Sequence, residues 1–208
     1  MDASKLFSKS RIVPVVVIED AAIAVDLAKT LRDAGAASIE VTLRTACALE
    51  AIELIAQQVP DLLVGAGSVR RPEQIAQIAA RGASFAVSPG ATELLIDAAI
   101  SQQMPLVPGA ATASEMIRLS ERGYQLQKFF PAEMLGGVPM LKALSGPLPE
   151  LKFFPTGGIN AALAKDYLGL ACVSCIGGSW FVPAAMLRDR DFAGIRKLTV
   201  EAMGIGAA

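Results

Sequence analysis

A lysine lies within an apolar, strand-like segment, where a charged side chain needs a specific explanation. Residues 126–131 have the sequence Leu-Gln-Lys-Phe-Phe-Pro, and Lys128 is the third of them. Burial in a strand penalises an ammonium ion and leaves a neutral amine, which can attack a carbonyl carbon and form a Schiff base. The segment therefore makes Lys128 a candidate nucleophile.

A second strand-like segment, residues 39–44, carries polar residues at alternate positions. Because side chains alternate across a strand, Glu40, Thr42 and Arg44 are expected on one face. Glu40 could transfer protons, and the Arg44 guanidinium could bind an anionic group. An amine, a carboxylate and a guanidinium on strands of one domain indicate Schiff-base chemistry on an oxo acid. The competing interpretation of Glu40 is a structural salt bridge with Arg44 or a lysine.

The composition excludes several other kinds of chemistry. The chain has 208 residues and no histidine, so triads and general bases that use histidine are excluded, as are metal sites that need imidazole. Cys172 and Cys175 form a C-x-x-C pair, but they fall in an apparent strand, where positions i and i+3 point to opposite faces. We therefore expect no metal site, and we interpret the cysteines as small buried residues in a reducing compartment.

The overall balance of residues favours one compact domain over residues 1–208. Hydrophobic residues make up 53% of the chain and charged residues 19%, and the net charge is −1. This balance gives no electrostatic footprint for nucleic acid or an anionic membrane. No apolar run approaches the roughly 18–20 residues that span a bilayer, and the start of the chain shows no cleavable signal pattern. A cytoplasmic location is expected.

Strand-like and helix-like segments alternate along the chain. Proline or capping side chains at Pro72, Thr112 and Asn160 predict helix starts, and glycines at 35, 82 and 123 predict helix ends. Amphipathic helical stretches separate the predicted strands. The strands are expected at residues 12–18, 38–43, 62–67, 85–89, 105–109, 126–131, 151–156 and 172–177.

Eight strand–helix units in this length predict an α/β fold with a parallel sheet. They match a single-domain (β/α)₈ TIM barrel, and the alternative is an open doubly wound sheet, which more often has five or six strands. The N-terminal extension, residues 1–10, is expected to be a short helix that closes the bottom of the barrel.

Two glycine-rich turns follow the seventh and eighth predicted strands, at residues 156–160 and 177–180. In barrels, these loops form a recurrent phosphate site. Glycine lets backbone N–H groups approach an oxyanion, and Ser179 adds a hydroxyl donor. The alternative is that the glycines serve only as turn residues.

The sequence Lys-Phe-Phe-Pro occurs twice, beginning at Lys128 and at Lys152. The two copies fall on neighbouring strands, and lysines at the same height on adjacent barrel strands should not both point inward. One lysine is expected inside and the other near the outer face or lower rim. Spacing alone leaves open which is which.

Several motifs together, in order between about residues 13 and 183, resemble a known family. The chain is similar to 2-keto-3-deoxy-6-phosphogluconate (KDPG) aldolases, which often also act as 4-hydroxy-2-oxoglutarate (KHG) aldolases. The motifs are Glu-Val-Thr-Leu-Arg-Thr at 40–45, Gly-Ala-Gly-Ser at 65–68, Ser-Pro-Gly at 88–90, Lys-Phe-Phe-Pro-Ala-Glu at 128–133, Thr-Gly-Gly-Ile at 156–159 and Ile-Gly-Gly-Ser-Trp at 176–180.

This resemblance implies a class I, metal-independent aldolase with a (β/α)₈ fold, usually a homotrimer, that needs no cofactor. It implies that Lys128 forms the Schiff base and that Glu40 is the acid/base. It also implies that Arg44 binds the substrate carboxylate, together with Ser68. Many members have threonine where this chain has Ser68, so the hydroxyl is kept and a methyl group is lost.

At the other end of the substrate, the resemblance implies a contact from Thr156. Gly157, Gly158, Gly178 and Ser179 match the phosphate-binding groups of the family. The expected partner is a small oxo-acid phosphate, cleaved to pyruvate and glyceraldehyde 3-phosphate, with 4-hydroxy-2-oxoglutarate as a further substrate.

Three alternatives stay open at this point. A related aldolase for the phosphogalactonate epimer would use the same lysine and glutamate. A sugar-phosphate isomerase or epimerase would share the phosphate turns, although such enzymes usually use histidine or a metal. A non-catalytic phosphosugar-binding barrel would leave the strand lysine unexplained. Glu133, just past the sixth predicted strand, could compete as the base, but its loop position favours a structural or interface role.

Overall fold

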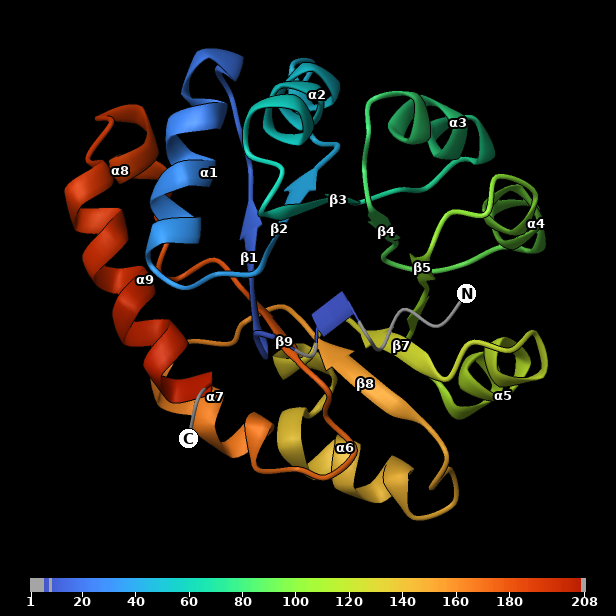
Figure 1. Ribbon diagram of the computed structural model, residues 1–208. Helices are drawn as coiled ribbons and strands as arrows, with labels where there is room; N and C mark the ends of the chain where they lie inside the picture. Colours follow the sequence, from blue (N-terminus) through green and yellow to red (C-terminus); the bar gives the residue numbers. More distant parts are fainter. Residues whose placement is uncertain (1–5, 8, 207–208) are drawn as a thin grey trace.

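Strands and helices alternate along the chain in a computed structural model that describes residues 6–7 and 9–206 (Figure 1). The strands are β1 Ile12–Val16, β2 Ser38–Thr42, β3 Leu63–Gly67, β4 Phe85–Val87, β5 Leu106–Val107, β6 Gly109–Ala110, β7 Leu126–Phe129, β8 Lys152–Pro155 and β9 Ile176–Gly178. The α-helices are α1 Ala24–Asp33, α2 Ala48–Gln58, α3 Pro72–Ala80, α4 Glu93–Ser101, α5 Ala113–Glu121, α6 Gly137–Ser145, α7 Ala161–Leu168, α8 Ala184–Arg188 and α9 Phe192–Gly206. Two 3-10 helices, η2 Ala21–Ile23 and η3 Glu133–Leu135, complete the described elements.

The helices form where the sequence gives both an apolar stripe and end signals. In α1 the buried residues Ala24, Leu27, Ala28 and Leu31 follow the spacing of one helix face. The predicted starts are confirmed: Pro72 lies in the first turn of α3, Thr112 forms a capping box with Glu115, and Asn160 caps α7. The predicted glycine ends are also confirmed, because Gly35, Gly82 and Gly123 adopt φ values of 98°, 80° and 87°.

All the strand pairs are parallel, and they fall into two sheets. One sheet has the order β5-β4-β3-β2-β1-β9, and the other has the order β6-β7-β8. Figure 1 shows the strands curled around a common centre with the helices on the outside. The alternation of strand and helix therefore gives the predicted α/β fold with a curled parallel sheet, but as two sheets and not as one continuous eight-stranded sheet.

Every predicted strand segment contains a strand, and the differences have local causes. The segment 105–109 is divided at Pro108 into β5 and β6, because proline has no N–H to give to a neighbouring strand. The prediction of a strand over 172–177 is wrong for residues 172–175, since β9 begins only at Ile176. Isolated parallel bridges join Phe153 to Val173 and Thr156 to Gly177.

The inner face of the sheets holds a small apolar cluster of its own. Its members come from both sheets, so the two sheets face each other across it: Val13, Phe85, Val87, Val107, Leu126 and Phe154, together with Phe7 and Cys175. Phe7 packs against the first residue of β4, Phe85, with ring centroids 5.2 Å apart. Most of the helix predicted over residues 1–10 lies outside the described residues, but Phe7 fills the amino-terminal end of this interior, as expected of a bottom closure.

Candidate active site

Lys128 and Glu40 form a buried ion pair between the two sheets. Lys128 lies in β7 and Glu40 in β2, and the Lys128 Nζ to Glu40 Oε1 distance is 3.3 Å. The exposed fractions of the two residues are 5% and 0%. The ammonium also lies over the Phe130 ring, 5.2 Å from its centroid. Two residues 88 positions apart in the sequence are thus brought together inside the curled sheet.

The Glu40 carboxylate is held on one side only. Its Oε1 accepts from Lys128, whereas its Oε2 is buried and has no hydrogen-bond partner among the described residues. On β3, Gly67 leaves room for this side chain, because a Cβ at position 67 would lie 2.2 Å from Glu40 Oε1. A buried carboxylate oxygen without a partner is costly, and it is free to accept a proton from a bound molecule.

Arg44 and Ser68 form a second polar pair at the carboxyl ends of β2 and β3. The parallel pairing of Thr42 with Gly67 places the two following loops side by side. Arg44 Nε donates to Ser68 Oγ at 3.1 Å, and Ser68 adopts a left-handed backbone with φ of 57°. Because Arg44 is exposed, its remaining N–H groups are free to bind a carboxylate. Arg44 lies just past the end of β2, whereas the sequence had placed it on the strand.

The register of β7 and β8 separates the two Lys-Phe-Phe-Pro copies. Lys128 pairs with Phe154, and Lys152 pairs with Leu126. Lys152 therefore lies two residues closer than Lys128 to the amino-terminal end of the paired strands. Lys152 is exposed at the start of β8 and donates to the Ala171 carbonyl at 2.9 Å. The expectation of one interior and one rim lysine is confirmed, but its premise of equal height is wrong.

The two glycine-rich turns lie side by side at the carboxyl ends of β8 and β9. The Thr156–Gly177 bridge joins them, and a Cβ on Gly177 would lie 2.5 Å from Thr156 Oγ1. Thr156 is 7% exposed, and its hydroxyl has no hydrogen-bond partner among the described residues. Gly157 and Gly158 have φ values of 103° and 82°, which favour glycine strongly.

In the second turn, Gly178 is covered by the Trp180 ring, and Ser179 is exposed. A Cβ on Gly178 would lie 1.9 Å from a ring carbon of Trp180, so the backbone and the ring are in close contact. Glycine at this position therefore has a packing reason as well as a possible role as an N–H donor. The exposed Ser179 hydroxyl is available to a ligand.

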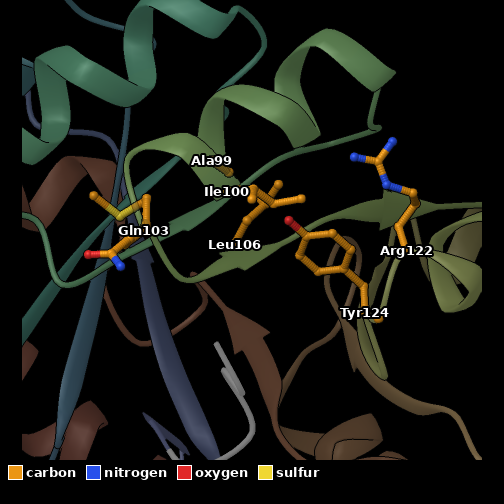
Figure 2. A pocket seen from close by; sticks show the side chains of 8 residues that line it. Ala99, Ile100, Gln103, Leu106, Arg122 and Tyr124 are labelled. Atoms are coloured by element: carbon orange, nitrogen blue, oxygen red, sulfur yellow. The ribbon is translucent and has the colours of Figure 1, made fainter.

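A separate hollow of about 340 Å³ lies between α4 and α5, away from these groups (Figure 2). Its lining comes from α4 and from the segments that lead into β5 and β7, which is the amino-terminal end of the strands. In Figure 2 the hydroxyl of Tyr124 points toward Ile100 and Leu106. Lys128, Glu40, Arg44 and the glycines of the two turns do not line it, so this hollow is not the candidate site.

One family description, KDPG and KHG aldolase, matches residues 4–198. This match covers nearly the whole chain, including every group of the site. The chain belongs to the KDPG and KHG aldolase family.

Relatives within the family cover almost the full length of the chain. A 2-dehydro-3-deoxy-phosphogluconate aldolase of Dickeya dadantii is 48% identical over 201 residues, which are 97% of this chain and 94% of the relative. A KHG/KDPG aldolase of Escherichia coli K12 is 47% identical with the same two coverages. A KDPG aldolase from Legionella pneumophila, solved with pyruvate as a covalent carbinolamine, is 43% identical, has a TM-score of 0.94 and covers 98% of each chain.

Two contributors to this aldolase site were not singled out from the sequence. Gly67 makes room for the Glu40 carboxylate, and Phe130 lies under the Lys128 ammonium. The glycine at the end of β3 was visible as part of Gly-Ala-Gly-Ser, but its contact with a side chain on the neighbouring strand depends on register. Phe130 is adjacent to Lys128 in the sequence, yet nothing in an apolar run marks one ring as the partner of a cation.

The three cysteines of this family member are free thiols. Cys172 and Cys175 precede β9, so the prediction that they belong to a strand is wrong. Cys175 is buried, Cys172 is half-buried, and burial raises the pKa of the Cys175 thiol well above its usual range. Over residues 6–7 and 9–206, no group of three or more His, Cys, Asp or Glu side chains is placed to hold a metal ion. In the same part of the chain, no helix is both long and apolar enough to cross a membrane.

Proposed function

We propose that the protein is a class I aldolase that cleaves 2-keto-3-deoxy-6-phosphogluconate to pyruvate and glyceraldehyde 3-phosphate without a cofactor. The observation that carries the proposal is the buried Lys128–Glu40 pair, 3.3 Å apart, with carboxylate-binding groups on one side and glycine turns on the other. The names of the relatives favour the same activity.

The reaction begins at the lysine. Lys128 gives a proton to Glu40, and the resulting amine attacks the C2 ketone to form a carbinolamine. Glu40 returns the proton to the carbinolamine hydroxyl, which leaves as water, and the product is a protonated imine. Glu40 accepts the proton of the C4 hydroxyl, directly or through water, and the C3–C4 bond breaks with its electron pair moving into the imine. Glyceraldehyde 3-phosphate leaves, C3 of the remaining enamine is protonated, and water hydrolyses the pyruvate imine to free the lysine.

The two ends of the substrate are held by different groups. Arg44 and Ser68 bind the C1 carboxylate, since their side chains meet at 3.1 Å and the guanidinium keeps further N–H groups free. The backbone N–H groups of Gly157, Gly158 and Gly178 and the Ser179 hydroxyl bind the phosphate.

Thr156 is the first residue of the glycine turn that follows β8. Its buried hydroxyl has no partner among the described residues, so it is free to contact the substrate chain. A free polar group in this position supports a role in substrate binding.

The same site also accepts 4-hydroxy-2-oxoglutarate, which would yield pyruvate and glyoxylate. This substrate has the same C1 carboxylate, C2 ketone and C4 hydroxyl but no phosphate, so it uses only part of the site. The Escherichia coli relative, 47% identical, carries both activities in its name.

The phosphogalactonate epimer is the competing substrate. A native KDPGal structure has a TM-score of 0.85 and only 24% identity to this chain, a likeness that shows the fold alone. The higher identity to KDPG aldolases favours the gluconate substrate.

The two sheets form one closed (β/α)₈ barrel over residues 1–208 in this proposal. Only Pro108 separates β5 from β6, and the bridges Phe153–Val173 and Thr156–Gly177 join the β8 and β9 segments. The backbone at Pro108 thus connects the sheets between β5 and β6, and the two bridges connect them between β8 and β9.

The aldolase is further proposed to be a homotrimer. Large apolar side chains are exposed on several elements, among them Leu94 on α4 and Met134 on η3, with exposed fractions of 70% and 85%. A 25% identical chain belongs to a designed cage built from symmetric oligomeric domains, which favours an oligomer. Light scattering should give about three times the 21.7 kDa of one chain.

A cytoplasmic location completes the proposal. The cysteines Cys47, Cys172 and Cys175 are all free thiols, a state that reducing compartments preserve.

The experiment that tests the function is a cleavage assay that measures pyruvate release. The phosphogluconate substrate, its C4 epimer and 4-hydroxy-2-oxoglutarate are compared at equal enzyme concentration. We expect the highest kcat/KM with the phosphogluconate substrate. A preference for the epimer would mean that the phosphogalactonate compound is the substrate. If none of the three is cleaved, the aldolase proposal is wrong.

A further inference from the structure

Glu133 lies where the loop that follows the lysine strand meets the first glycine turn. The backbone N–H of Ala132 donates to the Thr156 carbonyl at 2.9 Å, and that of Glu133 donates to the Gly157 carbonyl at 3.1 Å. The parallel pairing of β7 with β8 thus continues past the ends of both strands. The loop that carries Glu133 and the turn at Gly157 are one connected piece of backbone.

The Glu133 side chain lies over this turn. A Cβ on Gly158 would be 2.7 Å from Glu133 Cβ, and a Cβ on Gly137 would be 2.9 Å from Glu133 Oε1. Both glycines have left-handed backbones, with φ of 82° and 59°. The Glu133 side chain therefore occupies space that glycine leaves open on both neighbouring segments: its Cβ lies against Gly158 and its carboxylate against Gly137.

A tyrosine hydroxyl holds the Glu133 carboxylate in place through a hydrogen bond. Tyr167 on α7 is fully buried, and its hydroxyl donates a hydrogen bond to Glu133 Oε1. Burial first, and then this hydrogen bond, raise the pKa of Tyr167 well above its usual value. The hydroxyl therefore stays protonated and remains a donor throughout the pH range of enzyme assays.

We propose that Glu133 is a positioning residue, anchored by Tyr167, that holds the turn Thr156–Gly158 in the conformation that binds the substrate phosphate. The inference rests on the proposed function, in which the N–H groups of Gly157 and Gly158 are phosphate donors. Glu133 touches the turn and not the reacting atoms. This explains why a carboxylate in the loop directly after the lysine strand need not act as a competing base.

The position of Glu133 predicts which substrate depends on it. Loss of the Tyr167 hydroxyl would loosen the turn at the phosphate end, while Lys128 and Glu40 keep their own contact at 3.3 Å. The phosphorylated substrate should then bind less tightly, and the binding of 4-hydroxy-2-oxoglutarate should be unchanged. A residue that served only general stability would weaken the reaction of both substrates alike.

The test compares Tyr167→Phe, Glu133→Ala and Glu133→Gln in full kinetics with both substrates. For Tyr167→Phe and Glu133→Ala we expect KM of the phosphorylated substrate to rise about ten-fold or more, as expected for hydrogen bonds that position a charged group. KM for 4-hydroxy-2-oxoglutarate should stay within about two-fold, because the unphosphorylated end makes no use of the turn. Glu133→Gln keeps an acceptor oxygen for Tyr167 and should recover most of the loss of Glu133→Ala.

The chain supplies a matched control, since it has only two tyrosines. Tyr124→Phe removes the other hydroxyl, in the hollow of Figure 2, and should leave KM unchanged for both substrates. Imine trapping with pyruvate and borohydride, which involves no phosphate, checks that each variant still has a working lysine site.

Equal losses on both substrates, or no loss in Tyr167→Phe and Glu133→Ala, would overturn the positioning role. A different result would show that the proposed function itself fails. If the unmodified enzyme traps no pyruvate imine, or cleaves both substrates equally well, then the lysine chemistry or the phosphate site is wrong, and the inference falls with it.

Discussion

The two oxygens of the Glu40 carboxylate have different surroundings. Oε1 accepts from Lys128 Nζ at 3.3 Å, whereas Oε2 is buried without a partner among the described residues. One oxygen can thus hold the amine in place while the other receives a proton from the substrate. In the proposed mechanism this asymmetry lets one residue serve both the formation of the imine and the cleavage of the C3–C4 bond.

Replacing Glu40 with glutamine should therefore remove the proton transfer and keep the shape. We expect kcat to fall by about 10²–10⁴-fold, the usual contribution of a general acid/base. Steady-state kinetics with the phosphorylated substrate measure the loss. If Glu40→Gln retains full turnover, another group such as Glu133 must be the base.

Ser179 acts at the opposite end of the proposed substrate, so its loss should appear in a different way. Ser179→Ala removes one hydroxyl donor while the glycine N–H donors stay, and we expect a loss of about 1.5–3 kcal/mol in transition-state binding. The loss should appear in kcat/KM for the phosphorylated substrate and largely vanish with 4-hydroxy-2-oxoglutarate. Equal damage to both would mean that the turn after β9 is structural.

The functional role of a single residue could be predicted from the sequence only where the type of residue and its place in a strand were enough to indicate it. The sequence showed a lysine in an apolar strand and a glutamate among polar residues at alternate strand positions. The structure brings these two residues, Lys128 and Glu40, together. The choice between Lys128 and Lys152 was not visible from spacing. It depends on the β7–β8 register, which offsets the two copies by two residues, and register is set by tertiary packing.

Glycines at strand ends make the space for functional side chains on neighbouring strands. Gly67 on β3 faces Glu40 on β2, and Gly177 on β9 faces Thr156 just past β8. In both cases a Cβ would lie within about 2.5 Å of the polar side-chain oxygen, well inside van der Waals contact. The strands therefore position the site in two ways. They carry the functional side chains, and glycines at their ends leave the space that these side chains occupy.

Gly67→Ala should displace the Glu40 carboxylate, because the new Cβ would lie 2.2 Å from Oε1. A misplacement of about 1 Å can cost about 100-fold in rate, so we expect a loss of that order. Overpacking should cost about 1–3 kcal/mol of stability, measured by denaturant unfolding.

Gly204→Ala is the matched control for this change, since a new Cβ at position 204 would meet no atom within 4 Å among the described residues, apart from its chain neighbours and the backbone of α9 itself. Its activity should be unchanged. An active Gly67→Ala enzyme would show that Glu40 tolerates displacement and would contradict its proposed role.

Element types and order were predictable because hydrophobic period and end signals agree along the chain. Pro72, Thr112 and Asn160 begin helices as predicted. The strand ends were less predictable: Pro108 interrupts a strand, and the segment containing Cys172 and Cys175 is apolar without pairing as a strand. Apolar character is shared by buried loops and buried strands, so it does not mark where pairing begins.

At the scale of the whole molecule, each sheet supplies part of the site. The six-stranded sheet carries Glu40 and leads into Arg44 and Ser68, and the three-stranded sheet carries Lys128 and leads into Thr156. The Lys128–Glu40 pair spans the interior between them. The number of strand–helix units predicted this general arrangement, but the division into two sheets arises from a single proline and from short bridges that hydrophobic patterns do not show.

The proposed chemistry needs no metal, because the protonated imine serves as the electron sink. The chain has no histidine, and the described residues offer no cluster of metal ligands. Cleavage should therefore continue at an unchanged rate after treatment with EDTA and desalting. Loss of activity that a divalent ion restores would contradict a class I mechanism.

The formation of an imine at Lys128 is the central claim, and reductive trapping tests it most directly. The enzyme is incubated with pyruvate and borohydride, digested, and the labelled peptide is identified by mass spectrometry. We expect one labelled site, Lys128, together with inactivation, and no label and no activity in Lys128→Ala. Label on Lys152, or cleavage that survives in Lys128→Ala, would contradict the proposed mechanism.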